Sequence, residues 1–354
     1  MTADPSAPVL SVADPSAPVL SSAGPSAPVL SLRALAVDFA VSSGTVRAVR
    51  GIDLDVMPGE VVGIVGESGS GKSAAMLAVM GLLAPNAATR GSVRFDGQEL
   101  VGAPAETLRR LRGGRIGMIF QDPMTSLNPV LSVGRQLAEA VVAHQRVSNK
   151  AALRKAEELL ELVSIPHAAQ RVKAYPHELS GGMRQRVMIA MAMANDPDLL
   201  IADEPTTALD VTIQAQILEV LARLRAERNL AIVLITHDLG VVAGIADTVN
   251  VMYAGRVVEQ GPVDEVFHES THPYTLGLLA CLPRLDRRDD DLQPIGGMPP
   301  ALDSLPPGCA FAPRCRHVID RCLADDPALR DLGPTRAACH VAPLPSPAHV
   351  GASA

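Results

Sequence analysis

The chain has 354 residues, of which 47% are hydrophobic but only 2% aromatic, so its core must be built from aliphatic side chains and Met. A formal net charge of −7 without basic blocks argues against nucleic-acid binding. No run of 18 apolar residues occurs, and the start "MTADPSAPVL" lacks the regions of a signal peptide, so we expect a cytosolic chain without a membrane span.

The first segment is a tandem repeat. Residues 3–32 read "ADPSAPVLSV", "ADPSAPVLSS" and "AGPSAPVLSL". Two prolines in each unit oppose both helix formation and strand pairing, and three short units are too few for a solenoid. We therefore predict a disordered tail over residues 1–31 and assign it no function.

A hairpin and a buried strand are predicted next. "LRALAVDFAV" (32–41) and "VRAVRGIDLDV" (46–56) alternate apolar and polar residues on either side of a Ser-Gly turn, which is typical of antiparallel strands. "EVVGIV" (60–65) is a short apolar run of the kind that a buried parallel strand gives. A glycine-rich turn and the helical stretch "SAAMLAVMGLL" follow it.

Strands and helices alternate through the middle of the chain. "IGMIF", "LLIA" and "AIVLIT" read as short apolar strands. In the helical pattern of residues 149–163, Leu153, Ala156, Leu160 and Val163 step by three and four. The alternation indicates an α/β fold with a mainly parallel sheet. After about residue 285 the chain becomes rich in Pro, Asp and Arg and then reaches clustered cysteines, which marks a boundary.

A phosphate-binding loop stands between a predicted strand and a predicted helix. "GESGSGKS" (66–73) matches G-x-x-x-x-G-K-[ST], and its glycines let several N–H groups point inward at a polyphosphate. The lysine would reach the β- and γ-phosphates of ATP, and the last serine would bind Mg²⁺. The predicted ATP-binding residues of this loop are Gly66, Glu67, Ser68, Gly69, Ser70, Gly71, Lys72 and Ser73.

A second motif, "DLLIADEP" (198–205), is an apolar strand that ends in two carboxylates. Asp203 suits the Mg²⁺ shell. Glu204 is the candidate to orient or activate the attacking water. The alternative is a pair of solvated acids at a strand end. The presence of a phosphate-binding loop in the same chain argues against it.

"LSGGMRQR" (179–186), just upstream, resembles the signature of the ATP-binding cassette (ABC) family, which is usually LSGGQ. Met183 stands where most members have Gln, but Ser180, Gly181 and Gly182 keep the donors of an anion site at a helix start. The resemblance implies that this turn caps the γ-phosphate held by a partner's loop. It also implies an ABC ATPase core with a small antiparallel β subdomain and a helical subdomain.

The same resemblance assigns the remaining motifs. Gln121 in "FQDP" matches the Q-loop, which touches Mg²⁺ and water, and His237 in "LITHD" matches the switch histidine that contacts the γ-phosphate. Asp210 in "TALD" would lie at a dimer interface. Phe39 aligns with the aromatic residue that stacks on adenine, although an alternating strand also puts Phe in a core. The ATPase resemblance covers about residues 32–285, with the helical subdomain at about 122–180.

Other stretches look like the ATPase subunits of dipeptide and oligopeptide importers: "FQDPMTSLNPV" (120–130), "YPHELSGGM" (175–183), "HPYTLGLLACLP" (272–283) and "GCAFAPRC" (308–315). This branch implies a heterodimer with a second homologous ATPase, two membrane permeases and an extracytoplasmic peptide-binding protein. The chain would sit at the cytoplasmic face of the plasma membrane. Its helical subdomain and residues 175–178 would face the permease, while the peptide cargo is inherited by analogy.

Three other functions remain open at this point. The same machinery could import another cargo, such as nickel or sugars. A non-transport ABC ATPase acting on DNA or ribosomes is the second, although this sequence has neither long coiled-coil inserts nor a second cassette. An iron–sulfur regulatory protein with a vestigial ATPase is the third, and the intact catalytic motifs argue against it.

Four of the five cysteines cluster near the C-terminus, with spacings of five, six and sixteen residues: Cys309, Cys315, Cys322 and Cys339. In a cytosolic chain such a cluster suggests a metal site more than disulfides. Zinc knuckles are usually tighter, and four widely spaced thiolates can equally hold a [4Fe–4S] cluster.

The "GCAFAPRC" stretch decides our expectation for these cysteines, because some dipeptide importer ATPases carry a [4Fe–4S] cluster there. Zinc, with His317 and His340 as substitute ligands, and free or disulfide-linked thiols are the alternatives. We predict that the centre staples an irregular extension over residues 286–354. Cys281, in the apolar "LGLLACL", is predicted to pack in the core.

Overall fold

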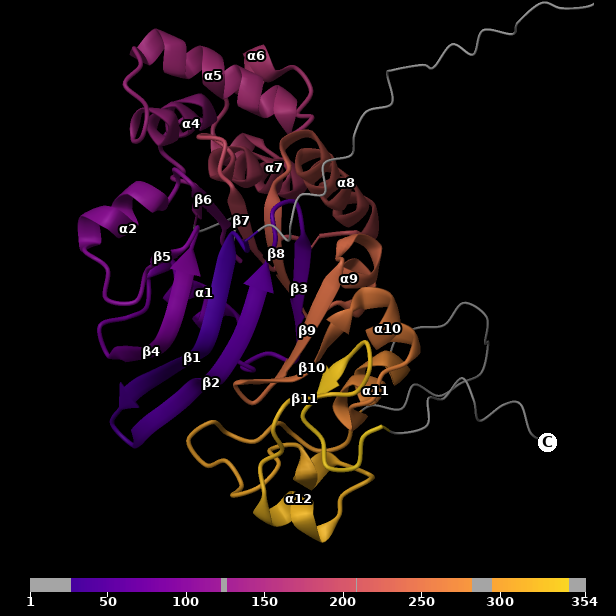
Figure 1. The fold of residues 1–354 in the computed structure, drawn as a ribbon. Helices are drawn as coiled ribbons and strands as arrows, with labels where there is room; N and C mark the ends of the chain where they lie inside the picture. Colours follow the sequence, from indigo (N-terminus) through magenta and orange to yellow (C-terminus); the bar gives the residue numbers. More distant parts are fainter. Residues whose placement is uncertain (1–26, 122–125, 208, 282–294, 344–354) are drawn as a thin grey trace, which may run out of the picture.

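The computed structural model describes residues 27–121, 126–207, 209–281 and 295–343 (Figure 1). The repeat tail predicted over residues 1–31 lies outside the described residues except for its last five. The boundary predicted near residue 285 also falls in an undescribed stretch. In the described ranges, the combination of length and apolar character that a bilayer-spanning helix needs occurs in none of the helices.

A central sheet of eight described strands organises the molecule, in the order β11-β12-β10-β9-β3-β8-β7-β6. The run from β9 to β6 is parallel, and β10, β11 and β12 extend it by antiparallel pairing. The strands are β3 (Val61–Val65), β6 (Ile116–Ile119), β7 (Leu199–Asp203), β8 (Ala231–Thr236), β9 (Thr248–Tyr253), β10 (Arg256–Pro262), β11 (Arg330–Asp331) and β12 (Arg336–Ala337).

Both faces of this sheet are covered, which explains why its strands read as continuous apolar runs. Along β3, Val61 and Val65 belong to one buried cluster, whereas Val62 and Ile64 belong to the cluster on the other face. Successive side chains of a strand point to opposite faces, so a strand between two layers must be apolar at every position. Each such buried side chain contributes roughly 1.5–3 kcal/mol of transfer free energy.

A smaller antiparallel sheet covers one face, with the order β2-β1-β4-β5. It consists of β1 (Leu30–Val41), β2 (Gly44–Val56), β4 (Ala87–Phe95) and β5 (Gln98–Glu99). The hairpin predicted over residues 32–56 is its first pair, joined at the register Val41 to Gly44. This sheet and the strands of the central sheet share the cluster that contains α1 (Lys72–Met80).

A group of helices forms one end of the molecule in Figure 1: α4 (Val133–Val142), α5 (Asn149–Leu162), α6 (Ala168–Arg171) and α7 (Gly181–Ala192). The short turn η1 (Pro176–Glu178) leads into α7, and α2 (Ala105–Leu111) lies beside β5 and β6. One detail of the predicted α5 stripe is wrong, because Leu153 is 47% exposed. The buried stripe instead follows Ala152, Ala156, Leu159 and Leu160.

The remaining helices follow β7 along the chain: α8 (Val211–Arg228), α9 (Leu239–Ile245), α10 (Val263–His268) and α11 (Pro273–Ala280). Cys281, at the end of α11, is only partly buried, so its predicted place in the core is wrong in part. Residues 295–343, which we call the C-terminal segment, occupy the opposite end of the molecule from α5 (Figure 1). The segment contains η2 (Ala312–Arg314), α12 (Asp320–Ala324), the edge strand β11 and its neighbour β12.

Candidate active site

The loop of residues 66–73 leaves β3 and enters α1 against the backbone of β2 and β9. Gly66 has φ 150°, and a Cβ there would lie 2.2 Å from the carbonyl oxygen of Met252. Gly71, the residue before α1, has φ 100°, and a Cβ would lie 2.2 Å from the carbonyl oxygen of Ala48. Both positions therefore require glycine, because the backbone has a positive φ and because a side chain would collide with a neighbouring carbonyl oxygen.

Lys72 is buried inside this loop, with 5% of its surface exposed. Its Nζ donates to the carbonyl oxygens of Gly66, at 2.8 Å, and Glu67, at 2.9 Å. Burial lowers the pKa of Lys72, and the carboxylates of Glu204 and Asp203 partly oppose that effect. An ammonium held in this way lacks a full counter-charge, which a polyphosphate would supply.

Asp203 and Ser73 provide oxygen ligands next to Lys72. The Ser73 hydroxyl donates to Oδ1 of Asp203 at 3.0 Å. Burial raises the pKa of Asp203, the Ser73 hydrogen bond opposes the rise, and the charge of Glu204 adds to it. A hydroxyl and a buried carboxylate are oxygen donors of the kind that Mg²⁺ prefers, so the residues present fit that ion.

The side chain of Glu204, which follows β7, contacts residues that follow the neighbouring strands β6 and β8. Its Oε2 accepts hydrogen bonds from Gln121 Nε2 at 3.0 Å and from Thr207 Oγ1 at 2.8 Å. His237 Nδ1 lies 3.5 Å from Oε1 of the same carboxylate. The predicted Q-loop glutamine, acidic residue and switch histidine therefore meet at one carboxyl group.

The backbone of Glu204 is held in an uncommon conformation, with φ +49°. Its N–H donates to the carbonyl oxygen of Ile235 at 2.9 Å, which fixes it to the end of β8. A non-glycine residue in this region of φ is strained, and the contacts around Glu204 compensate for that strain.

The signature turn lies on a separate helix. Ser180 precedes α7, and its Oγ accepts from the Met183 N–H at 3.3 Å. Asp210 plays the same role for α8, accepting from the Ile213 N–H at 2.9 Å. Gly182 packs so closely that a Cβ would lie 2.6 Å from Ile213 Cγ2, whereas Gly181 is exposed. Among the described residues, no hydrogen bond or ion pair joins residues 180–182 to the loop of residues 66–73.

Phe39 does not itself line the cavity of about 500 Å³ that adjoins the loop, but its strand partner does. It pairs directly with Val46, and residues directly opposite in antiparallel strands share one face. Val46 lines the cavity together with Glu67, Ser68, Gly69, Ser70, Tyr253, Ala254 and residues 298–303. Phe39 is half-buried and also packs on the cluster under the small sheet. Stacking on adenine and packing in the core both stay predictions for it.

Comparison with known proteins identifies the family. The model of the ABC transporter family matches residues 49–207, which include the loop, the signature and both carboxylates. The oligopeptide transport ATP-binding protein OppD of Salmonella typhimurium is 52% identical over 302 residues, covering 85% of this chain and 90% of the relative. The chain belongs to the ABC transporter family. A second family model also matches the chain. It describes the C-terminal region of oligopeptide/dipeptide transporters and matches residues 258–322.

Other relatives agree in sequence but differ in length. OppD of Mycobacterium tuberculosis is 58% identical over 308 residues, and the chain spans only about half of its length. The dipeptide transport protein DppD of Bacillus subtilis is 53% identical, with 88% of it covered. Among solved structures, the dimeric ATP-binding cassette MJ0796 bound to ADP and Pi matches with a TM-score of 0.60 and 28% identity, covering 66% of this chain and 98% of that one.

The C-terminal segment of this ABC family member carries the four predicted cysteines. The Cys309 N–H donates to the Cys322 carbonyl oxygen at 2.8 Å, and the Sγ of Cys315 accepts from the His317 N–H at 3.3 Å. A charge at Cys322 would add to the rise in the pKa of each of the other three thiols, so the four cysteines lie in one part of the segment. None of the four is in a disulfide.

These thiols do not yet form a ligand set. Burial raises the pKa of Cys309 to about 11 and also raises the pKa values of Cys315 and Cys339, so the protonated forms are favoured. Among the described residues, no group of three or more His, Cys, Asp or Glu side chains lies close enough together to hold a metal ion. In this structure the four thiols are therefore too far apart to share one metal ion or cluster.

Three contributors to the site were missing from the sequence predictions. Thr207 stands three residues after Glu204, a spacing that could have indicated a turn contact. Tyr274 Oη accepts from the Glu67 N–H at 3.0 Å. Arg314 forms an ion pair with Glu67 at 2.7 Å. The last two pairs are separated by more than two hundred residues, so no local pattern pointed to them.

Proposed function

We propose that this chain binds and hydrolyses ATP to power the import of dipeptides or oligopeptides through an ABC transporter. The observation that carries the proposal is the meeting of Gln121, Thr207 and His237 at the Glu204 carboxylate, next to Lys72 and Asp203. The names of its relatives, oligopeptide and dipeptide transport ATP-binding proteins, support the choice of cargo.

Each residue has a stated task in hydrolysis. The N–H groups of the loop and the Lys72 ammonium bind the phosphates of ATP, and Ser73 and Asp203 would hold Mg²⁺, which neutralises phosphate charge. Glu204 accepts a hydrogen bond from the attacking water and takes its proton on a carboxylate oxygen. Gln121 and His237 orient that carboxylate and face the γ-phosphate.

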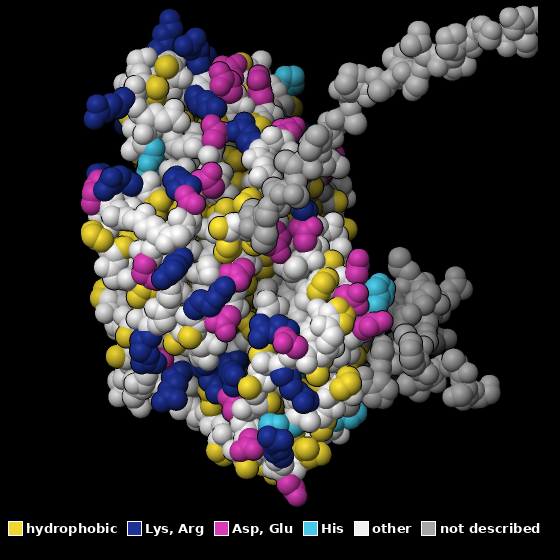
Figure 2. All heavy atoms as spheres, in the orientation of Figure 1, with side chains coloured by type: hydrophobic (Ala, Val, Ile, Leu, Met, Phe, Trp, Pro, Cys, Tyr) yellow, Lys and Arg dark blue, Asp and Glu magenta, His cyan; other side chains and the backbone are white. Residues whose placement is uncertain are grey.

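A second ATPase would complete the site. We infer that the Ser180 turn caps ATP held by a homologous partner, and that the partner's turn caps ATP held by this chain. The dimeric MJ0796 structure supports such an arrangement. Two permeases, an extracytoplasmic peptide-binding protein and a position at the cytoplasmic face of the membrane complete the proposal. The helical subdomain, with Tyr175 42% exposed beside α7, is the proposed permease-facing surface. Basic and acidic side chains are interspersed on the face drawn in Figure 2, which gives nucleic acid no continuous basic surface.

Replacement of the central carboxylate tests this proposal. Glu204→Gln keeps the shape and the hydrogen-bonding capacity but removes the proton acceptor, so turnover should fall by about 100-fold or more. ATP binding should persist, and the closed dimer should accumulate. ATPase assays, nucleotide-binding titrations and gel filtration measure these three effects. Glu219→Gln, an exposed glutamate on α8, is the matched control. Normal turnover in Glu204→Gln would remove that residue from its role.

The cargo is tested separately. The complex purified with its permeases and reconstituted in vesicles should accumulate labelled peptides when ATP is present on the side of this chain. Peptide uptake that depends on Lys72 supports the proposal. Uptake of nickel or a sugar without peptide uptake would assign the ATPase to another importer.

We propose further that the four cysteines of the C-terminal segment hold a [4Fe–4S] cluster, with zinc as the alternative. Support comes from their number, their location in one segment and the small apolar cluster of that segment, which gives it little core of its own. The sulfurs would have to move together to bind it. Anaerobic purification followed by iron and sulfide analysis and absorbance near 400 nm is the test. Zinc would support the alternative, and a metal-free, folded segment would contradict both.

A further inference from the structure

The guanidinium of Arg314 reaches from the cysteine-bearing part of the C-terminal segment into the nucleotide loop. Its Nη1 donates to Oε2 of Glu67 at 2.7 Å, and its Nη2 donates to Oε1 at 2.9 Å. This two-pronged pairing fixes the carboxylate in position as well as in charge. The Arg314 side chain is only 4% exposed, so solvent and salt screen the pair weakly.

The rest of Arg314 is held equally firmly. Its Nε donates to the Gly296 carbonyl oxygen at 3.0 Å, and Nη1 also reaches Tyr253 Oη at 3.3 Å. The guanidinium carbon lies 5.8 Å from the centre of the Tyr253 ring and 6.0 Å from that of Phe311. An arginine with this many fixed partners acts as a rigid connector rather than a mobile surface charge.

Glu67 is in turn restrained at each of its polar groups. Its N–H donates to Tyr274 Oη at 3.0 Å, its carbonyl oxygen accepts from Lys72 Nζ at 2.9 Å, and its carboxylate accepts from Arg314. The carbonyl partner is the lysine that must meet the phosphates. Displacement of Glu67 would therefore move both the loop backbone and the Lys72 ammonium.

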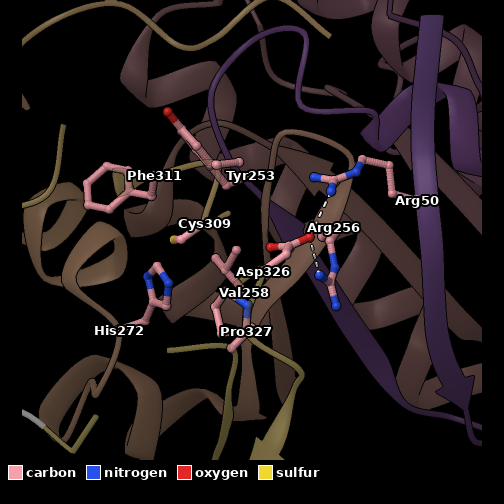
Figure 3. A pocket seen from close by; sticks show the side chains of 11 residues that line it. Arg50, Tyr253, Arg256, Val258, His272, Cys309, Phe311, Asp326 and Pro327 are labelled. Carbon is pink, nitrogen blue, oxygen red and sulfur yellow. Dashed lines mark hydrogen bonds and ion pairs between the residues drawn. The ribbon is translucent and has the colours of Figure 1, made fainter. Parts of the chain in front are cut away.

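The C-terminal segment is also locked against the ATPase core near this connection. Figure 3 shows Asp326 between the guanidinium groups of Arg50 and Arg256, at 2.7 and 2.6 Å. The pocket drawn there has a volume of only about 20 Å³, so the segment is closely packed on β2 and β10. Residues 298–303 of the same segment form a wall of the cavity beside the loop.

We propose that Arg314 is a positioning residue for ATP binding, through which the cysteine-bearing segment sets the conformation of the nucleotide loop. The inference rests on the proposed nucleotide site. It extends that site by a residue that touches neither phosphate nor metal and acts through Glu67. By linkage, ATP bound at the loop must stabilise the segment as much as the segment stabilises bound ATP.

A double-mutant cycle on the full-length chain in its assembled transporter tests the connection. Arg314→Gln and Glu67→Gln should each raise the KM for ATP about five- to twentyfold, and Arg314→Gln should leave kcat within about twofold. Because both changes break the same connection, the KM of the double variant should not exceed that of the more strongly affected single variant. Arg314→Lys should recover part of the loss, since it keeps the charge but not the fork. Arg321→Gln, whose partner Asp325 lies on the same exposed surface, should leave KM unchanged.

Hydrogen exchange supplies a readout that an unspecific structural role would not move. Binding of a non-hydrolysable ATP analogue should slow exchange of the amides of residues 311–315 in the wild type, and Glu67→Gln should abolish that slowing. Glu67 lies on the core, so this arm holds even where Arg314→Gln fails to fold. Unchanged KM in Arg314→Gln, multiplicative effects in the cycle, or no change of exchange would each overturn the proposal.

The nucleotide site itself is checked by Lys72→Ala. Loss of ATP binding in Lys72→Ala with normal binding in Arg314→Gln would overturn only the positioning role. Normal binding in Lys72→Ala would overturn the proposed nucleotide site and the inference with it.

Discussion

The ATPase core and the C-terminal segment differ in how much apolar core each has of its own. The core is built on two large apolar clusters that sandwich the parallel strands. The segment has one small cluster of its own, around Ala337, Cys339 and Ala342, and regular elements of two to five residues. The segment is held to the core by Ala310 and Phe311, which join the larger core cluster. Polar connections made by Arg314, Asp326 and the strand β12 add to this contact.

The comparison explains where the protein can be tuned. An apolar cluster is insensitive to ligands and ions, whereas a fixed ion pair can be broken by a change in either partner. The segment is thus suited to respond to the state of the nucleotide loop, and the core is suited to remain unchanged while it does so.

The core side of the comparison predicts the largest effect. Leu160 in α5 is fully buried, so Leu160→Ala should lower the free energy of unfolding by about 2–5 kcal/mol through lost burial and a cavity. Leu153→Ala, on the exposed side of the same helix, should cost less than about 0.5 kcal/mol. Urea unfolding curves measure both. Equal costs would show that the helix packs by the stripe that the sequence suggested.

A buried histidine at the junction predicts an intermediate, pH-dependent effect. His272 Nδ1 accepts from the Tyr274 N–H at 3.1 Å, and burial lowers the pKa of His272 to about 4 from its ordinary 6.5. Between pH 6.5 and 4, His272 is therefore protonated in the unfolded chain but neutral in the folded chain. Stability is unaffected above pH 6.5 and falls as the pH drops from 6.5 to 4, by at most about 3 kcal/mol.

The matched variant for that effect is His272→Asn, which keeps an acceptor at the helix start but does not titrate. Thermal unfolding of the variant should show a smaller decline than the wild type across this pH range. Parallel curves for the two proteins would contradict the assignment of the decline to His272.

The segment side predicts the smallest effect, and a local one. Asp326→Asn removes the charge shared by Arg50 and Arg256, which should weaken docking of the segment by about 1–2 kcal/mol without unfolding the core. Amide exchange in residues 320–331 should accelerate about 5–30-fold. Asp331→Asn, whose partner Arg336 holds an exposed pair, is the control and should leave exchange near the wild-type rate. Unfolding of the whole chain in Asp326→Asn would erase the distinction between the two regions.

Local pattern predicted much of the core. The strand β3, the loop and α1 follow from an apolar run, a glycine spacing and a helical stretch that are contiguous in the chain. The buried stripe of α5 was predicted correctly at Ala156, Leu160 and Val163 and wrongly at Leu153 alone. Ala152 is small and buried, while Leu153 is larger and exposed. A stripe chosen by side-chain size therefore included one residue that faces solvent.

Contacts between distant residues could not be predicted in the same way. Arg314 and Glu67 are 247 residues apart, and either one alone reads as a solvated charge. The same holds for Asp326, which meets Arg50 across 276 residues. The gathering of Gln121 and His237 at Glu204 was expected only as far as a family resemblance carried it.

The sequence by itself determined the chemistry of the nucleotide loop, because a curled glycine backbone, a lysine and a helix start are encoded within eight consecutive residues. It also determined which strands are buried, since their apolar runs leave no other stable placement. Only the tertiary structure decided how the cysteine-bearing segment meets that loop. Charged side chains find partners by the path of the whole chain, and that path is fixed by packing far from either partner.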